Sequence, residues 1–466
     1  MGKNKAKITS TILNEGPTVV GMMSAIIERG GSIDTAVRDV AINGPERSAA
    51  LFKQIVTKAD TRQIPDIPHG VSEMLSTLPA EAAAFRRSVH MVVAAAASSD
   101  IVERKRMLGE ASDIALTGLK EIGETYSTSL NVPCMMIFGL GIMVPMVLMS
   151  ILPMLSLGGM FGSSPIGTGP IVLITLVFIP AIILSLILSV KEKNPFMRAS
   201  SNMDVKHIAP AILAAPAALA VFFITKDLQM SLLAAALASG AALLAYAAPH
   251  SRSEKIREKQ EMLLQDSVFE LGNRLIAGEN FETSIVKAIG ARAECRPVAD
   301  SVYREMGICR GDPCSAIRSS VGKISARISG VFCDVYRCSL KDTRDAGRLA
   351  VSVGRQIQDQ DSVRKGIKNK LKSMTDMMTG TAAVFAPLVL GMSVTMLDPI
   401  SKVMNGVDFS GTSSILSVYL IELCILVSIL TSFLSGKIDL RDIAYRLGMM
   451  LPLSLIVFTV CSSIGL

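Results

Sequence analysis

The sequence contains no tryptophan, and aromatic residues make up only 5% of its 466 residues. This scarcity excludes the stacked aromatic surface of a single-strand nucleic-acid binder and leaves little material for an interfacial aromatic belt. Only four histidines occur, and HExxH, GxSxG and GxxxxGK[ST] patterns are all missing. We therefore expect no catalytic site, no cofactor, no metal and no nucleic-acid partner.

The eight cysteines are scattered, which does not resemble the disulfide framework of a small secreted protein. Five fall in one polar segment and form two CxxxxC spacings: Cys295, Cys309, Cys314, Cys333 and Cys338. Zinc sites normally show tighter pairs with a matching second pair or histidines. We expect buried thiols in a reducing compartment.

Apolar residues make up half of the chain, and the mean hydropathy is +0.45. A membrane-spanning helix needs about 20 mainly apolar residues. Seven runs meet this requirement, at 131–153, 169–190, 207–225, 230–248, 378–397, 413–435 and 446–466. The pattern predicts an all-α polytopic membrane protein with two soluble helical bundles. The predicted regions are 1–129, 130–248 (four spans), 249–377 and 378–466 (three spans).

The distribution of basic residues predicts the orientation of these spans. All but two of the 47 Lys and Arg residues fall in the two soluble segments and two short loops, which seven alternating spans place on one side. The remaining two are Lys226 and Lys402. By the positive-inside rule both bundles and the N-terminus are expected in the cytoplasm, and the C-terminus outside.

A helix-hairpin pattern occurs twice, because segment 25–41 aligns with 273–289 without a gap. In each copy a glycine ends one helical pattern, and a polar residue two positions later precedes an apolar residue and an acid. The glycine suits a left-handed helix end and the polar residue an N-cap. These residues are Gly30 and Ser32 in the first copy and Gly278 and Asn280 in the second.

About 110 residues after each glycine comes an apolar run with a central proline, 142–148 around Pro145 and 384–390 around Pro387. The repeated unit is therefore a soluble helical bundle that leads into a proline-containing span. Matching order and spacing of both parts predict an internal duplication.

This arrangement resembles the type II secretion system F domain of filament and secretion platform proteins. The residues that carry the resemblance are Gly30-Gly-Ser-Ile-Asp-Thr-Ala36, Gly278-Glu-Asn-Phe-Glu-Thr-Ser284 and the two proline runs. It covers roughly 15–155 and 262–400. Seven spans are most similar to the archaeal FlaJ or TadC-like branch, whereas bacterial pilus versions usually have three.

The resemblance implies a non-enzymatic platform in the cell membrane beneath a type IV filament. Its implied partners are a cytoplasmic hexameric secretion ATPase, pilin- or archaellin-like subunits and membrane lipids, and a homodimer is compatible with it. The candidate ATPase contacts are basic residues before the fifth span, namely Arg355, Arg364, Lys365 and Lys368. Anionic lipid headgroups are the other partner expected for this cluster.

Glu422 is a carboxylate within a predicted span, which indicates a functional site by default. Three roles of Glu422 stay open: a proton or ion site, a contact with a substrate helix, and a protonated glutamate bonded to a neighbouring helix. Two other functions are also left open, a two-repeat secondary transporter and a sensor or scaffold of another membrane complex. A transporter would normally gather several polar groups near the midplane.

Overall fold

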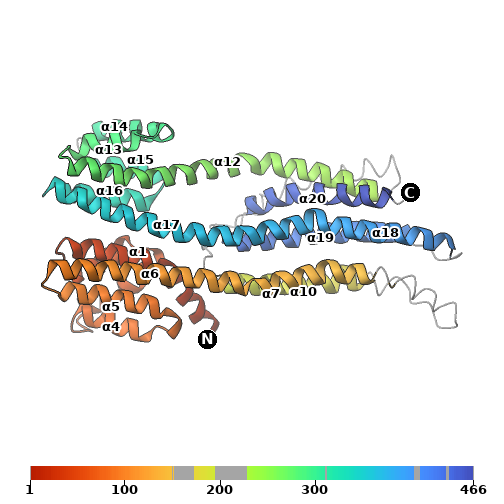
Figure 1. Cartoon of the computed structure of the whole chain (residues 1–466), viewed down its shortest axis with the longest axis horizontal. Helices are drawn as coiled ribbons and strands as arrows, with labels where there is room; N and C mark the ends of the chain where they lie inside the picture. The colour runs from red at the N-terminus through yellow and green to blue at the C-terminus, as the bar shows by residue number, and fades with distance from the viewer. Residues whose placement is uncertain are drawn as a thin grey trace. The chain divides into compact units, whose positions relative to one another are not determined.

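The computed structural model describes residues 2–148, 151, 173–194, 228–309, 312–403, 410–436 and 440–464. All regular structure in these ranges is helical (Figure 1). The described chain divides into two compact units. Unit 1 contains Met1–Glu124 and Ser253–Ile367, and unit 2 contains Thr125–Arg252 and Lys368–Leu466. The two predicted soluble segments therefore form one unit together, and the predicted span regions form the other.

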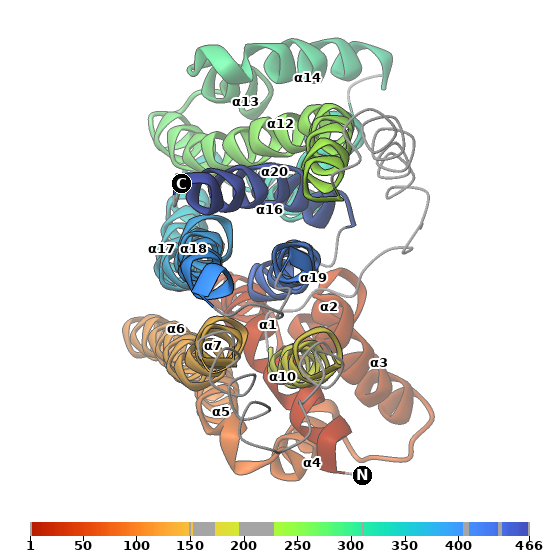
Figure 2. The same cartoon turned by 90° about the vertical axis from the view of Figure 1, so that its right-hand side faces the viewer.

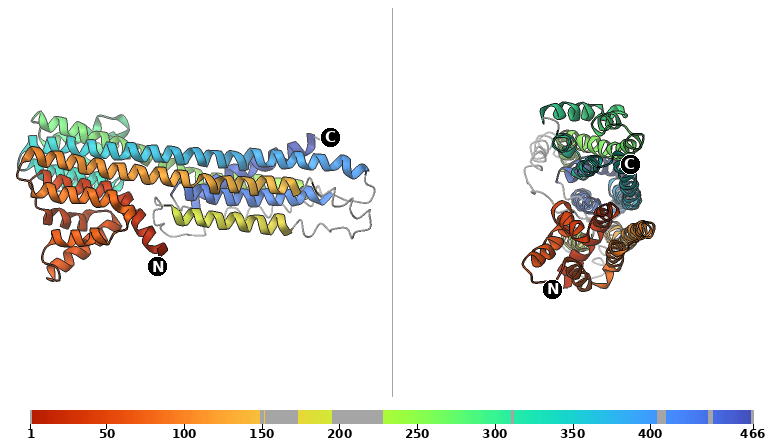
Figure 3. Two further views of the ribbon diagram at one scale, coloured as in Figure 1. Left: turned by 60° about the horizontal axis from the view of Figure 1, so that its bottom comes forward. Right: turned by 90° about the vertical axis from the view of Figure 1, so that its left-hand side faces the viewer.

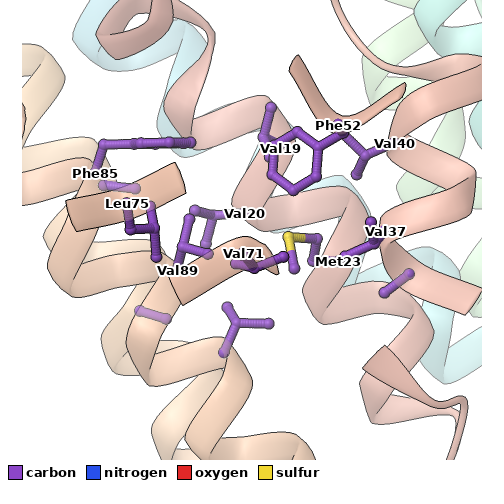
Figure 4. Close-up of a cluster of buried hydrophobic side chains, with 14 of the residues drawn as sticks. Val19, Val20, Met23, Val37, Val40, Phe52, Val71, Leu75, Phe85 and Val89 are labelled. Atoms are coloured by element: carbon purple, nitrogen blue, oxygen red, sulfur yellow. The ribbon is translucent and has the colours of Figure 1, made fainter. Parts of the chain in front are cut away.

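The first half of unit 1 is a bundle of short helices packed against two longer ones. Its elements are α1 (Gly2–Glu28), α2 (Ile33–Asn43), α3 (Glu46–Asp60), α4 (Ile67–Thr77), the 3-10 turn η1 (Ala80–Ala82), α5 (Ala83–Ala97) and α6 (Ile101–Ser129). Apolar residues at helical spacing on α1 point into a core with α2, α4 and α5 (Figure 4). Val20, Met23, Val37, Val71 and Val89 are all fully buried there.

The second half of unit 1 repeats this order of elements. They are α12 (Leu228–Ile276), α13 (Phe281–Gly290), η6 (Ala293–Cys295), α14 (Arg296–Ile308), α15 (Pro313–Ser320), η7 (Val321–Lys323), α16 (Ala326–Ser339) and α17 (Thr343–Gly380). A separate apolar core forms among them, with Leu271, Ile285, Val302 and Phe332 at 0% exposure.

The two hairpins share one hydrogen-bond pattern. Gly30 and Gly278 both have positive φ, +78° and +90°. In the first copy the Gly30 N–H donates to the Ile27 carbonyl and the next N–H donates to the Ile26 carbonyl, both at 3.0 Å. The second copy makes both bonds at the corresponding positions, at 3.0 and 3.1 Å. This is the Schellman ending of a helix, in which the left-handed residue lets two terminal carbonyls find donors.

Unit 2 is built from long apolar helices. It holds α7 (Asn131–Phe138), η2 (Gly139–Met143), η4 (Ile174–Phe178), α10 (Ile179–Lys193), η8 (Thr381–Phe385), α18 (Ala386–Val403), α19 (Ser410–Leu434) and α20 (Leu440–Ile464), with the ends of α6, α12 and α17. Six stretches are long and apolar enough to cross a membrane: Ile101–Leu148, Ile174–Glu192, Gln229–Ile276, Thr343–Met396, Ser413–Leu434 and Leu440–Ser463. These six stretches indicate a multi-pass membrane protein.

α19 is the central helix of unit 2. It contacts α10, α18 and α20, and the end-on view shows it between them (Figure 2). In its most apolar stretch 61% of residues are buried, against 33–39% in the other five. Close backbone approach occurs at Gly240 of α12, where an added Cβ would lie 3.0 Å from the Gly448 carbonyl of α20. The fourth predicted span thus packs on the last span at this glycine.

The count of seven spans is not reproduced, because six are found in the described residues. The third predicted span, 207–225, lies outside them. Three spans are also longer than predicted, since α6, α12 and α17 continue without a break between the units (Figure 3). The predicted boundaries at 248 and 377 therefore fall inside α12 and α17, whereas the boundary at 129 coincides with the end of α6.

Candidate functional site

The hairpin residues shape the first helices of each bundle. Ser32 is the N-cap of α2, and its side chain accepts a hydrogen bond from the Thr35 N–H at 3.2 Å. Asn280 occupies the same position before α13, but its side chain makes no cap hydrogen bond, so that part of the prediction is wrong. The Asn280 carbonyl instead accepts from the Thr283 hydroxyl at 3.1 Å. The backbone conformation is shared between the copies, and the side-chain cap is not.

A pair of glutamines on α17 ties the two bundles of unit 1 together. Gln360 is only 4% exposed, and its Nε2 donates to the Pro17 carbonyl of α1 at 2.8 Å. One turn earlier, the Gln356 Nε2 donates to the Ser112 hydroxyl of α6 at 3.1 Å. Gly21 of α1 makes room, because a Cβ there would lie 2.7 Å from the same Gln356 nitrogen. We call these five residues the bundle joint.

A cavity of about 80 Å³ lies beside the bundle joint, between α1 and α2 of the first bundle and α16 and α17 of the second. Four charged residues line it: Arg29, Asp39, Arg327 and Asp334. Burial raises the pKa of Asp334; Arg29 opposes this rise and Asp39 adds to it. The lining therefore combines charged side chains with apolar ones such as Met22 and Val353.

The four predicted basic residues all lie on α17. Arg355, Lys365 and Lys368 are exposed, and Arg364 is half-buried. The Lys365 Nζ lies 3.0 Å from the Met262 sulfur of α12. The first copy carries no base at the positions that correspond to Arg364, Lys365, Lys368, Lys370 and Lys372, which are Ile122, Gly123, Tyr126, Thr128 and Leu130. No basic residue lies in 122–130, just before the first proline-containing run, so the basic stretch precedes only the second run.

A π-helical turn lies just before the central proline of each of the two apolar runs. The turn η2 ends two residues before Pro145, and η8 ends two residues before Pro387. A third turn, η4, stands in the same relation to Pro180. A proline inside a helix has no N–H and its ring clashes with the carbonyl four residues earlier, so a wider turn relieves the clash. These turns accompany the prolines for that reason.

The carbonyl that Pro145 would otherwise bond has a partner on another helix. This carbonyl belongs to Gly141, and it accepts a hydrogen bond from the Tyr419 hydroxyl of α19 at 2.6 Å. Tyr419 is completely buried. In the second repeat a weaker contact joins the Cys424 sulfur, also on α19, to the Ala382 carbonyl at 3.9 Å. The central helix therefore binds the proline turn of each repeat.

Glu422 lies on α19 between these two contacts and is partly exposed. No hydrogen bond or ion pair of its carboxylate is found among the described residues. The polar network that does join α12, α19 and α20 lies elsewhere, where Gln229 contacts the hydroxyls of Ser413 (2.8 Å) and Ser462 (3.1 Å). Glu422 therefore stays a candidate without an observed partner.

All eight cysteines are free thiols. In the described part of the chain no group of three or more His, Cys, Asp or Glu side chains is placed to hold a metal ion. The sequence analysis missed the bundle joint and Tyr419. Only Tyr419 had a signal in the sequence, because a proline inside a helix implies a carbonyl that needs a donor from another element.

Comparison of the chain with known protein families, with curated proteins and with solved structures gave no match.

Proposed function

We propose that the protein is a membrane platform of a type IV filament machine, such as an archaellum, pilus or Tad system. In this role it couples a cytoplasmic hexameric ATPase to the insertion of pilin-like subunits, and it has no enzymatic activity of its own. The observation that carries the proposal is that two helical bundles have the same pair of hairpin bonds after a glycine with positive φ. In each copy the last helix of the bundle continues into a proline-containing apolar stretch.

Helix continuity supports a mechanical role. The stretches Ile101–Leu148 and Thr343–Met396 each carry the backbone from a polar bundle into an apolar region without an intervening loop. A hydrogen-bonded helix resists bending far better than a loop does, so displacement of a bundle is passed along it. The buried amides of the bundle joint hold the two halves in one register.

The basic stretch of α17 is the proposed contact for the ATPase. Exposed bases steer and hold an acidic partner, and their presence in one repeat only gives the platform a single oriented attachment side. Anionic lipid headgroups are the competing partner for the same charges.

Binding of the ATPase tests the site. Replacement of Arg364, Lys365 and Lys368 by glutamate is expected to abolish co-purification of a hexameric secretion ATPase from the same cells. The matched control reverses Arg296 and Arg304, two exposed bases on α14 of the same bundle. Unchanged co-purification of the triple variant would refute the site.

The role itself is tested in cells. Deletion of the gene is expected to remove surface filaments in electron micrographs, and the wild-type gene should restore them. Cells that keep their filaments after deletion, or purified protein that hydrolyses ATP at enzymatic rates, would refute the platform function. Substrate uptake by vesicles containing the purified protein would favour the transporter instead.

A further inference from the structure

Two cysteines of the second bundle contact each other across two helices. Cys314 is the second residue of α15, and Cys333 lies in the middle of α16. The Cys314 sulfur lies 3.9 Å from the Cys333 carbonyl, and the Cys333 sulfur lies 3.7 Å from the Cys314 carbonyl. The spacing in the sequence pairs 309 with 314 and 333 with 338, whereas the structure brings together one member of each pair.

The two thiols differ in access. Cys333 is 1% exposed, and burial together with the adjacent Cys314 raises the pKa of its thiol, which keeps it protonated. Cys314 is only partly buried and sits in the first turn of its helix. Cys314 is therefore the more accessible of the two thiols, and the buried Cys333 lies against it. This is the arrangement of an attacking thiol with a resolving thiol behind it.

We propose that Cys314 and Cys333 form a reversible disulfide when the protein meets a low-molecular-weight disulfide. The Cys314 thiolate attacks one sulfur of the reagent and releases the other half as a thiol. The Cys333 thiol then loses its proton and displaces the second half from the Cys314 sulfur. The reagent disulfide is reduced to two thiols, and the protein dithiol is oxidised to one S–S bond.

The bond would join α15 to α16 and close the loop from 314 to 333, which contains η7. Closing a loop reduces the number of conformations open to the unfolded chain, so the second bundle becomes harder to unfold. The same bundle carries the basic stretch of α17. Oxidation therefore stiffens one half of unit 1 and leaves the other unchanged. This inference does not depend on the proposed function.

The test uses the full-length protein in detergent and oxidised glutathione as the reagent. After incubation, free thiols are alkylated and the protein is digested with trypsin, which places Cys314 in peptide 311–318 and Cys333 in peptide 328–337. We expect a linked pair of these two peptides that dithiothreitol separates. We also expect a higher midpoint of thermal unfolding, by several degrees.

Variants separate the two steps. Cys333→Ser should keep a stable glutathione adduct on Cys314 and show no rise in the midpoint, and Cys314→Ser should leave Cys333 unmodified. Double replacement of Cys309 and Cys338 by serine is the matched control and should still give the linked peptides. The proposal is overturned if folded wild-type protein gives no link, if the link runs to Cys309 or Cys338, or if the midpoint does not rise.

Discussion

The hydrogen bond from Tyr419 to Gly141 allows a sharp test of how the membrane unit is held together. Tyr419→Phe removes one hydroxyl from a fully buried side chain and leaves the ring in place. The Gly141 carbonyl cannot turn to the usual donor four residues on, because that residue is Pro145. The variant therefore leaves a buried carbonyl without its donor from α19.

The expected loss of unfolding free energy follows from two known free energies. Leaving a buried acceptor unsatisfied costs about 1–3 kcal/mol, whereas hydrogen bonds between membrane helices average about 0.6 kcal/mol. Because the carbonyl lacks its usual donor, we expect about 1–2 kcal/mol, above the membrane average. In a domain of the size of unit 2 this corresponds to roughly 2–8 °C in the unfolding midpoint.

The assay is reversible unfolding in mixed detergent, monitored by circular dichroism or by the fluorescence of an attached label, since the chain has no tryptophan. Tyr445→Phe is the control, since it removes a hydroxyl for which no hydrogen bond is found in the described residues of the same unit. Pro145→Ala supplies the missing N–H, so Tyr419→Phe should cost less in that background. Equal losses for both tyrosines, or the same loss with and without Pro145, would refute the reasoning.

Three further predictions concern unit 1. Gly278→Val should destabilise unit 1 by at least about 1 kcal/mol in thermal unfolding, because the left-handed φ of +90° strains a β-branched residue although nothing lies near an added Cβ. The control is Gly366→Ala, at an open site inside α17, which should stabilise the unit slightly. Equal effects of the two substitutions would contradict the hairpin. Gln360→Leu should lower the unfolding free energy by about 0.5–1.5 kcal/mol, because it removes a buried hydrogen bond to the Pro17 carbonyl, and an unchanged midpoint would count against the bundle joint. The raised pKa of Asp334 means that the folded protein holds this proton more tightly than the unfolded chain, so the associated stability is present below the unfolded pKa of 3.8 and is lost as pH rises through the folded value. Asp334→Asn should therefore gain stability relative to wild type at pH 7 but not at pH 3, and a gain of the same size at both values would show that the charge is not responsible.

The sequence by itself predicted much of the secondary structure. Helical spacing of apolar residues, the glycine endings at Gly30 and Gly278, and the order of elements in two copies are local properties, and local sterics decide them. The all-helical class and the presence of several apolar helices long enough for a membrane followed from the same patterns. The Ser32 cap was predictable for the same reason, whereas the Asn280 side chain makes no cap hydrogen bond.

Only the tertiary structure decided which residues from distant parts of the chain meet. Gln360 and Pro17 are far apart in sequence, and so are Tyr419 and Gly141. Their pairing depends on how helices dock, and a buried amide or hydroxyl shows no periodic pattern that would identify its acceptor. The cysteines give the clearest case. The two CxxxxC spacings did not predict which cysteines meet. The packing of α15 on α16 brought Cys314 to Cys333, because side-chain contact is set by the facing surfaces of two helices and not by distance along the chain.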